Sequence, residues 1–144
     1  MKMIILLIVS LFSVSVSAST KLTSQQLNWQ TWSPLVFQQA KQNNRLVLLD
    51  LTAKWCQWCK KMDAISYHDK AVIETIQKYY IAVRADEDDV LELKKKYKDY
   101  GRPATIIFNA KGEEIIKRRG YLKPQWLMWM LQAVAENPQI EAHQ

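Results

Sequence analysis

Apolar stretches alternate along the chain with amphipathic ones, and this alternation predicts a series of strands and helices. Short, mainly apolar runs are typical of buried strands. They predict strands at 46–51, 81–85 and 104–108, and a further strand at 113–119 follows turn residues at 109–112. Apolar residues at helical spacing predict helices at about 34–43, 56–65, 69–79 and 90–97, and a last helix from about 124.

The order of these elements predicts a mixed α/β sandwich. Strands that are separated by helices usually pair in parallel, and a closing hairpin adds an antiparallel edge. We therefore expect a central mixed sheet that is flanked by helices. No repeat or linker interrupts the series, so one domain is expected over 33–136, with a helical N-terminal extension at 19–32 and a polar C-terminal tail at 137–144.

The helical spacing also predicts which residues face the core. Ser33 is expected to cap the first helix and Pro34 to lie in its first turn. The apolar stripe of that helix consists of Leu35, Val36, Phe37 and Ala40. The stripe of the last helix consists of Trp126, Leu127, Met130, Leu131 and Val134. Trp126 and Trp129 are three positions apart, so at least one of the two rings is expected in the core.

The composition is that of a globular domain. Among 144 residues 49% are hydrophobic, and 3 Gly and 2 Cys exclude a collagen and a disulfide-dense miniprotein. The formal net charge is +6, and the basic clusters at 94–96 and 117–119 are typical of solvated faces, so no nucleic-acid partner is expected. The acidic run Asp86–Asp89 is interpreted as charge complementation at a helix N-terminus, and His68 as part of a polar turn.

The first eighteen residues predict export. A basic start at Lys2, an apolar run over 4–16, and Val16 and Ala18 at the −3 and −1 positions are typical of a secretory signal that is cleaved after Ala18. An uncleaved membrane anchor is the alternative, but a bilayer needs about 20 apolar residues. We therefore expect removal of 1–18, no stable membrane insertion afterwards, and a periplasmic or secreted protein.

The two cysteines, Cys56 and Cys59, directly follow an apolar strand and begin a helix. Residues three apart on a helix share a face, and in an oxidising compartment two thiols at that spacing form a disulfide. At a helix N-terminus the free amide groups favour a thiolate at Cys56, whereas Cys59 lies one turn deeper and is expected to be better shielded. These positions predict that Cys56 attacks a substrate disulfide and that Cys59 resolves the mixed disulfide.

Other interpretations of the cysteine pair stay open. A purely structural disulfide that closes so short a loop contributes only about 2 kcal/mol to stability. A structural zinc site usually needs four ligands, and only His68 and His143 are histidines. Copper(I) is the stronger alternative, because Met62 follows Cys59 by three positions and soft sulfur ligands select that ion. We expect neither a metal nor a cofactor.

Several segments of the chain resemble motifs of one superfamily. The stretch 47–62, which contains Trp55-Cys56-Gln57-Trp58-Cys59-Lys60, resembles the active-site strand, turn and helix of the thioredoxin superfamily. The stretch 101–108 resembles its cis-proline loop and the following strand, and Lys111-Gly112-Glu113 with Gly120 resembles its hairpin and last turn. The resemblance covers about 33–136 and implies a thioredoxin-like fold. Exported thiol-reducing domains and W-C-x-W-C domains with a preceding Trp-Ser helix are the most similar groups.

The resemblance implies a role for each matching residue. Asp50 corresponds to the buried carboxyl beneath the disulfide, whose raised pKa suits proton exchange with Cys59. Pro103 corresponds to the cis-proline that faces the disulfide, and the backbone at Arg102 to the segment that pairs with an extended substrate. The Arg102 side chain is expected to favour the Cys56 thiolate, to meet an acidic substrate or to face solvent.

Two further features of the site follow from the same resemblance. Trp55 and Trp58 complete the expected substrate-binding residues. Gln57-Trp58 replaces the Gly-Pro of thioredoxin itself, at positions that influence the redox potential in the superfamily. The lysine that often accompanies the buried carboxyl is replaced by Ala82, so proton handling at Asp50 is expected to differ.

Together these features predict an exported thiol:disulfide oxidoreductase that reduces or isomerises disulfides in envelope proteins through the Cys56/Cys59 couple. Its expected partners are protein disulfide substrates and a membrane thiol reductant, without a cofactor. One alternative is a copper(I)-binding chaperone that uses Cys56, Cys59 and Met62. The other is a non-catalytic thioredoxin-like interaction module.

Overall fold

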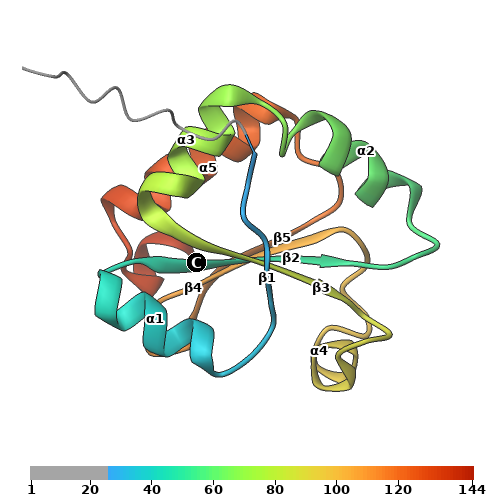
Figure 1. Cartoon of the computed structure of the whole chain (residues 1–144), viewed down its shortest axis with the longest axis horizontal. Helices are drawn as coiled ribbons and strands as arrows, with labels where there is room; N and C mark the ends of the chain where they lie inside the picture. Colours follow the sequence, from blue (N-terminus) through green and yellow to red (C-terminus); the bar gives the residue numbers. More distant parts are fainter. Residues whose placement is uncertain (1–25) are drawn as a thin grey trace, which may run out of the picture.

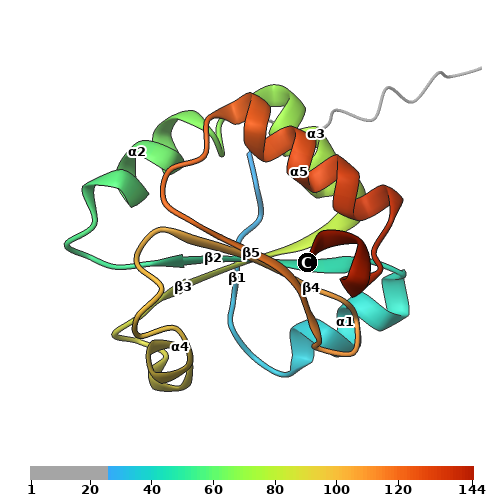
Figure 2. The same ribbon diagram turned by 180° about the vertical axis from the view of Figure 1, so that it is seen from behind.

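Five strands form one mixed sheet in the computed structural model, which describes residues 26–144 (Figure 1). In sheet order the strands are β1 (Gln30–Thr31), β3 (Tyr80–Asp86), β2 (Leu46–Thr52), β4 (Ala104–Phe108) and β5 (Glu114–Arg119). The helices are α1 (Leu35–Asn43), α2 (Gln57–Ile65), α3 (Lys70–Tyr79), α4 (Leu91–Lys96) and α5 (Pro124–Glu136), followed by a 3-10 helix η1 (Ile140–His143). Figures 1 and 2 show α2, α3 and α5 on one face of the sheet and α1 and α4 on the other. This layered arrangement confirms the predicted α/β sandwich.

Strand β4 runs opposite to β2, and this corrects the prediction of parallel pairing. Strands β1, β3 and β2 are parallel, as expected, and the antiparallel hairpin of β4 and β5 is confirmed. The helix between β3 and β4 is α4, whose 6 residues span about 9 Å. The 7 residues of β3 span about 23 Å, so α4 is too short to return the chain to the other end of the sheet.

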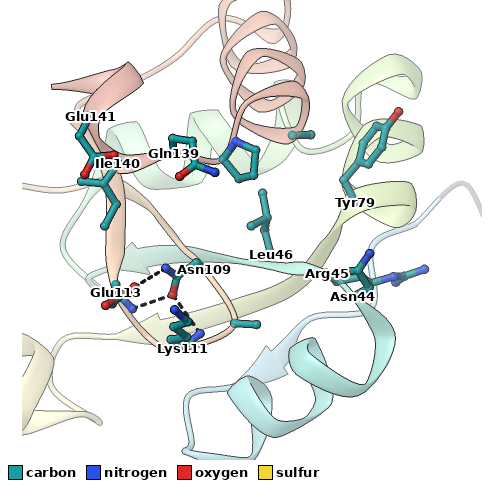
Figure 3. A pocket seen from close by; sticks show the side chains of 13 residues that line it. Asn44, Arg45, Leu46, Tyr79, Asn109, Lys111, Glu113, Gln139, Ile140 and Glu141 are labelled. Carbon is teal, nitrogen blue, oxygen red and sulfur yellow. Dashed lines mark hydrogen bonds between the residues drawn. The ribbon is translucent and has the colours of Figure 1, made fainter.

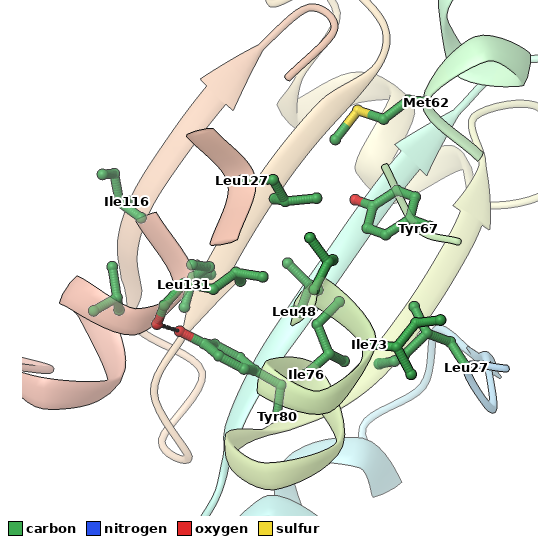
Figure 4. Packing of buried hydrophobic residues seen from close by; sticks show 14 of the residues in the cluster. Leu27, Leu48, Met62, Tyr67, Ile73, Ile76, Tyr80, Ile116, Leu127 and Leu131 are labelled. Atoms are coloured by element: carbon green, nitrogen blue, oxygen red, sulfur yellow. Dashed lines mark hydrogen bonds between the residues drawn. The ribbon is translucent and has the colours of Figure 1, made fainter. Parts of the chain in front are cut away.

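Strand β2 lies in the middle of the sheet and contributes to the core on both faces. Its odd-numbered residues 47–51 pack with α1 and α4, whereas Leu48 packs with α2, α3 and α5. Figure 4 shows the cluster that contains Leu48. In it the Tyr80 hydroxyl donates a hydrogen bond to the Leu131 carbonyl oxygen at 2.6 Å. Because side chains alternate along a strand, Asp50 lies on the same face as Leu48, the face that α2 covers.

The prediction that Trp126 or Trp129 of the last helix lies in the core is wrong, because both rings are exposed. The side chains of Trp126 and Trp129 are 62% and 50% exposed. The buried residues of α5 follow a narrow line at i, i+4 and i+7, as expected for a helix that touches the sheet with one stripe. They are Leu127, Leu131 and Val134. The two tryptophans lie off that line and contact each other edge to face, with ring centroids 5.9 Å apart.

Helix α1 begins one residue later than predicted. Pro34 is at its N-cap position and no side chain caps the helix, so the predicted cap by the Ser33 hydroxyl is wrong. The Ser33 carbonyl oxygen instead accepts a hydrogen bond from the Val36 N–H at 3.2 Å. Val36 and Ala40 are buried, but Leu35 is exposed because it is turned from Val36 by about 100° around the helix.

The described part of the predicted N-terminal extension belongs to the sheet. A helix was expected there, but residues 26–32 contain strand β1, which pairs with β3. Leu27 of the same segment is buried in the core. At the other end of the chain, η1 lies against β5 within the predicted tail. The predicted signal segment 1–18 lies outside the described residues. Within residues 26–144, no helix combines the length and apolar character needed to cross a membrane.

Candidate active site

Cys56 and Cys59 form a disulfide just beyond the carboxyl end of β2, with their Cα atoms 5.3 Å apart. The turn before them closes through a hydrogen bond from the Cys56 N–H to the Ala53 carbonyl oxygen at 3.0 Å. Cys56 then occupies the N-cap of α2, and its Sγ accepts a hydrogen bond from the Cys59 N–H at 3.1 Å. The helix N-terminus therefore directs an amide donor at this sulfur, and such a donor also stabilises a thiolate.

Both cysteines are buried, which corrects the expectation that Cys59 is the better shielded of the two. Cys56 is 2% exposed and Cys59 is 7% exposed. Cys56 has an extended backbone at the N-cap, and its side chain lies against the first turn of α2, where both cysteines pack with Ala53. The large exposed side chains of the motif include Trp55 and Trp58, at 65% and 55% exposure.

An aromatic and cationic surface continues from the motif. The rings of Trp58 and Tyr121 lie with their centroids 5.8 Å apart. The Lys61 Nζ atom lies 4.9 Å from the Trp58 centroid and 5.2 Å from that of Tyr121, within the range of cation–π attraction. We call these three residues the Trp58 cluster. It presents flat apolar rings and one positive charge next to the second cysteine.

Asp50 is a buried carboxyl in the middle of the sheet. It is 2% exposed and lies between Arg84 of β3 and Thr105 of β4 in the strand register. The Arg84 Nε donates a hydrogen bond to its Oδ2 at 2.8 Å. Burial raises the pKa of Asp50 to about 6, although the adjacent Arg84 guanidinium acts in the opposite direction. The carboxyl therefore exchanges a proton close to neutral pH.

Arg84 supplies a positive charge next to Asp50. In the superfamily a lysine often supplies it, and Ala82 stands at that lysine's position in this chain. Ala82 and Arg84 share a face of β3, but Arg84 is the one aligned with Asp50 across the sheet. Its Nη2 also contacts the Oδ1 of Asp63 in α2 at 2.7 Å, so the guanidinium joins the sheet to the active-site helix. The Trp29 ring covers the guanidinium at 4.0 Å. The sequence reasoning missed this residue, although an arginine inside an otherwise apolar strand is a visible signal.

Tyr67 closes the same polar cluster from the turn after α2. Its ring contacts Trp29 edge to face at 4.8 Å. Burial, and secondly the Asp50 charge, raise the pKa of Tyr67 well above its ordinary value, so its hydroxyl stays protonated. The Asp50 carboxyl thus lies beside the Arg84 cation and the Tyr67 hydroxyl, without direct access to bulk solvent.

The Arg102–Pro103 peptide bond is cis, as the resemblance implied. The Arg102 side chain is 2% exposed, and its Nη2 lies 2.8 Å from the Glu87 Oε2. Its Nη1 donates hydrogen bonds to the carbonyl oxygens of Tyr97 at 3.1 Å and Gly101 at 2.7 Å. The expectations that this side chain faces solvent or meets an acidic substrate are therefore wrong, because it is buried and already paired.

Glu87 was missed as a site residue. Besides Arg102, its carboxylate contacts Trp55, whose Nε1 donates a hydrogen bond to Oε1 at 3.1 Å. The acidic run was expected to complement a helix N-terminus, but α4 begins at Leu91 and the acidic residue in its first turn is Glu92. Pairing of Glu87 with two other loops requires three-dimensional proximity, for which the sequence carries no signal.

Met62 belongs to the hydrophobic core. It is fully buried in the cluster that Figure 4 shows, which includes Leu127, whereas the two cysteines pack in a separate group with Ala53. Its sulfur is therefore accounted for by packing. Within residues 26–144, no three His, Cys, Asp or Glu side chains are grouped to hold a metal ion.

A hollow of about 630 Å³, whose lining Figure 3 shows, is formed at the start of β2. The disulfide lies at the opposite end of that strand. The hollow is lined by Arg45 and Leu46 at the start of β2 and by Ile140 of η1, whereas the cysteines follow the last residue of β2. In its wall the Asn109 Nδ2 donates a hydrogen bond to the Glu113 Oε2 at 2.6 Å, so these polar groups stabilise the hairpin turn. This hollow is not part of the disulfide site.

A protein-family model named Thioredox_DsbH and described as "Protein of unknown function, DUF255" matches residues 13–112. The chain belongs to this family. The match begins within the predicted signal segment and includes the cysteine motif and the cis-proline loop, up to the turn between β4 and β5. Membership of the Thioredox_DsbH family therefore rests on the same segments that form the site.

Several curated relatives of this Thioredox_DsbH chain are named thiol:disulfide interchange proteins. It is 29% identical to DsbD of Campylobacter jejuni over 99 residues, and this aligned region covers 64% of the chain and 17% of that protein. It is 35% identical to DsbD of Ralstonia nicotianae over 78 residues, a region that covers 52% of the chain and 13% of that protein. The chain thus spans less than a fifth of the length of these relatives.

Solved structures confirm the thioredoxin-like fold. A structure described as "DsbH Oxidoreductase" superposes with a TM-score of 0.67 at 17% identity, over 88% of this chain and 96% of that one. The oxidised C-terminal domain of Neisseria meningitidis DsbD gives 0.55 at 22% identity, over 68% and 89%. Together with the family match, this likeness shows that the Thioredox_DsbH chain has a thioredoxin-like fold with a Cys56–Cys59 pair.

Proposed function

We propose that the chain is an exported thiol:disulfide oxidoreductase that reduces or isomerises disulfides of envelope proteins. The observation that carries this proposal is the position of the Cys56–Cys59 disulfide. It lies at the N-terminus of α2, directly after the central strand β2, and that strand carries the buried Asp50 on the face that α2 covers. The names of the curated relatives support the same reaction class.

The proposed reaction is a two-step exchange. In the reduced protein, the Cys56 thiolate attacks one sulfur of a substrate disulfide and expels the other sulfur as a thiolate, which takes up a proton. Cys59 then loses its proton and attacks the Cys56 sulfur, which releases the second substrate thiolate and forms the Cys56–Cys59 disulfide. The substrate gains two electrons and the protein loses two. A thiol donor, which we infer to be a membrane thiol reductant, restores the dithiol.

Asp50 is the proposed acceptor of the Cys59 proton. Burial raises its pKa to about 6, so at neutral pH most molecules hold a carboxylate that is a stronger base than an ordinary aspartate. Arg84 and Asp63 connect this carboxyl to α2, the helix that carries Cys59. A base at this place assists the second step, because a neutral thiol is a poor nucleophile.

The substrate is proposed to bind as an extended segment along the cis-proline loop. Pairing with the backbone at Arg102 supplies sequence-independent hydrogen bonds, as in strand addition to a sheet edge. Trp55 and the Trp58 cluster offer exposed rings on the motif itself for side chains beside the substrate cysteine. This arrangement suits protein disulfides in general rather than one small molecule.

The proposal is tested by the reduction of insulin disulfides with dithiothreitol. We expect the purified protein to accelerate insulin precipitation and the double variant Cys56→Ser, Cys59→Ser to leave the uncatalysed rate unchanged. A wild-type protein that gives no acceleration would contradict the proposal. Anaerobic titration of the reduced protein completes the test, because a tight stoichiometric copper(I) complex without thiol exchange would favour a copper chaperone instead.

A further inference from the structure

Glu87 lies between the two loops that flank the disulfide motif. Its Oε1 accepts a hydrogen bond from the Trp55 Nε1 at 3.1 Å, on the loop that precedes Cys56. Its Oε2 lies 2.8 Å from the Nη2 of Arg102, the residue before the cis-proline. Its backbone N–H donates to the Thr52 carbonyl oxygen at 2.9 Å. One carboxylate therefore contacts both loops and is itself fixed to the end of β2.

Burial makes the contact between Glu87 and Arg102 strong. The Glu87 side chain is 15% exposed and that of Arg102 is 2% exposed, so their charges attract each other with little screening by water. Among the described residues, Glu87 is the only carboxylate paired with Arg102. Removal of one member of such a pair leaves the other charge buried and uncompensated, and the surrounding loop must rearrange to hydrate it.

The neighbouring acidic residues do not share this position. Asp88 pairs with Lys94 in α4 at 2.7 Å, and both side chains are 47% exposed. Lys54 and Asp89 form a looser exposed contact at 3.7 Å. Of the four acidic residues in the turn Asp86–Asp89, Glu87 is the one whose carboxylate contacts both loops.

We propose that Glu87 is a positioning residue for substrate binding, which couples the Trp55 loop to the cis-proline loop. This inference rests on the proposed function, because it assigns the bound species as an extended disulfide-containing polypeptide. With Glu87 in place, the Arg102 guanidinium is held in the interior, and the backbone of Arg102 is left for the substrate to pair with. The same carboxylate fixes the Trp55 ring next to Cys56, where it contacts the bound segment. Preorganisation of both loops lowers the ordering cost of binding.

The test is a set of steady-state measurements with a fluorescent peptide that contains one disulfide. We expect Glu87→Ala to raise KM by about tenfold and to change kcat by less than about twofold, as expected when charge-assisted contacts that orient a binding surface are lost. Glu87→Gln keeps an acceptor for Trp55 and serves if the alanine variant does not fold. The matched control is Asp88→Asn, which removes a charge from the same turn without touching either loop and should leave KM unchanged.

A double-mutant cycle separates positioning from a general loss of stability. Trp55→Phe removes the indole N–H, and we expect it to raise KM in wild type more than in the Glu87→Ala background, because the contact is already absent there. Amide hydrogen exchange gives a readout without substrate: exchange in 53–56 and 101–104 should rise together in Glu87→Ala, and not in Asp88→Asn.

Two outcomes would overturn the inference. One is a KM in both Glu87 variants equal to that of Asp88→Asn, and the other is exchange that rises in one loop alone in Glu87→Ala. If the wild-type protein does not exchange disulfides, the proposed function fails first, and the hydrogen-exchange measurement still decides whether Glu87 couples the loops.

Discussion

Replacement of Cys56 by serine is expected to lower kcat/KM for disulfide reduction by at least about 10³-fold, because it removes the attacking sulfur. Replacement of Cys59 by serine is expected to stop turnover at a different step. Cys56 still attacks the substrate, but no second thiol resolves the mixed disulfide. Cys59→Ser should therefore accumulate a covalent complex with a disulfide substrate, whereas Cys56→Ser should not.

The complex is measured by non-reducing gel electrophoresis and mass spectrometry after incubation with a disulfide-containing peptide. A thiol reductant must release the peptide, and digestion must locate it on Cys56. The pair of serine variants forms the matched control, because each keeps one cysteine of the motif. Capture by Cys56→Ser through Cys59, or equal capture by both variants, would reverse or remove the proposed division of roles.

Asp50→Asn is expected to change the pH dependence of stability between about pH 4 and pH 7. Burial raises the pKa of Asp50 from 3.8 to about 6, so the folded protein binds this proton more tightly than the unfolded chain. The resulting stabilisation is complete below pH 4 and is lost as the pH rises through 6. The difference in pKa corresponds to about 3 kcal/mol. Relative to wild type, Asp50→Asn should therefore gain about that amount of unfolding free energy from pH 4 to pH 7.

Urea unfolding of the oxidised proteins at several pH values measures this difference. The Arg84 guanidinium keeps Asp63 as a partner at 2.7 Å in the variant, so no buried cation is left alone. Asp63→Asn is the matched control, because it removes the other, half-exposed partner of Arg84 and leaves Asp50 in place. A difference between wild type and Asp50→Asn that stays constant from pH 4 to pH 7 would show that Asp50 has an ordinary pKa.

The same substitution tests the catalytic role. If Asp50 accepts the Cys59 proton, resolution of a preformed mixed disulfide should accelerate as the pH rises through about 6 in wild type. In Asp50→Asn this rise should be absent and the step slower by about 10²-fold, the lower end of general-base effects. Stopped-flow release of the substrate thiol measures the step. An unchanged profile would leave Asp50 as a structural group only.

The parts that were predicted correctly from sequence are local in the chain. Strand β2, the two cysteines and helix α2 are contiguous, so an apolar run followed by the motif was enough to place Cys56 at a helix N-terminus. The helix predicted at 69–79 also starts where expected, because Asp69 is the N-cap of α3 and its carboxylate accepts a hydrogen bond from the Val72 N–H at 3.1 Å. The cis bond before Pro103 followed from the resemblance, since composition and spacing carry no signal for it.

The parts that were missed depend on partners distant in sequence. Arg84 aligns with Asp50 through strand register, and Glu87 contacts Trp55 across 32 positions. Burial of Cys56 was also missed, because helical position predicts its amide donor but not how its side chain packs. Trp126 was predicted to be buried because it is apolar, but it is exposed. The stripe of helix α5 that packs on the sheet is narrower than the set of its apolar residues.

The central claim is that Cys56 reacts as a nucleophile although it is only 2% exposed in the disulfide form. Alkylation of the reduced, folded protein with iodoacetamide at pH 7, with the modified site located by mass spectrometry, tests it most directly. We expect Cys56 to be modified at least about tenfold faster than Cys59, because amide donors at the helix N-terminus stabilise its thiolate. Faster modification of Cys59, or two cysteines that stay unmodified until the protein is unfolded, would contradict the account.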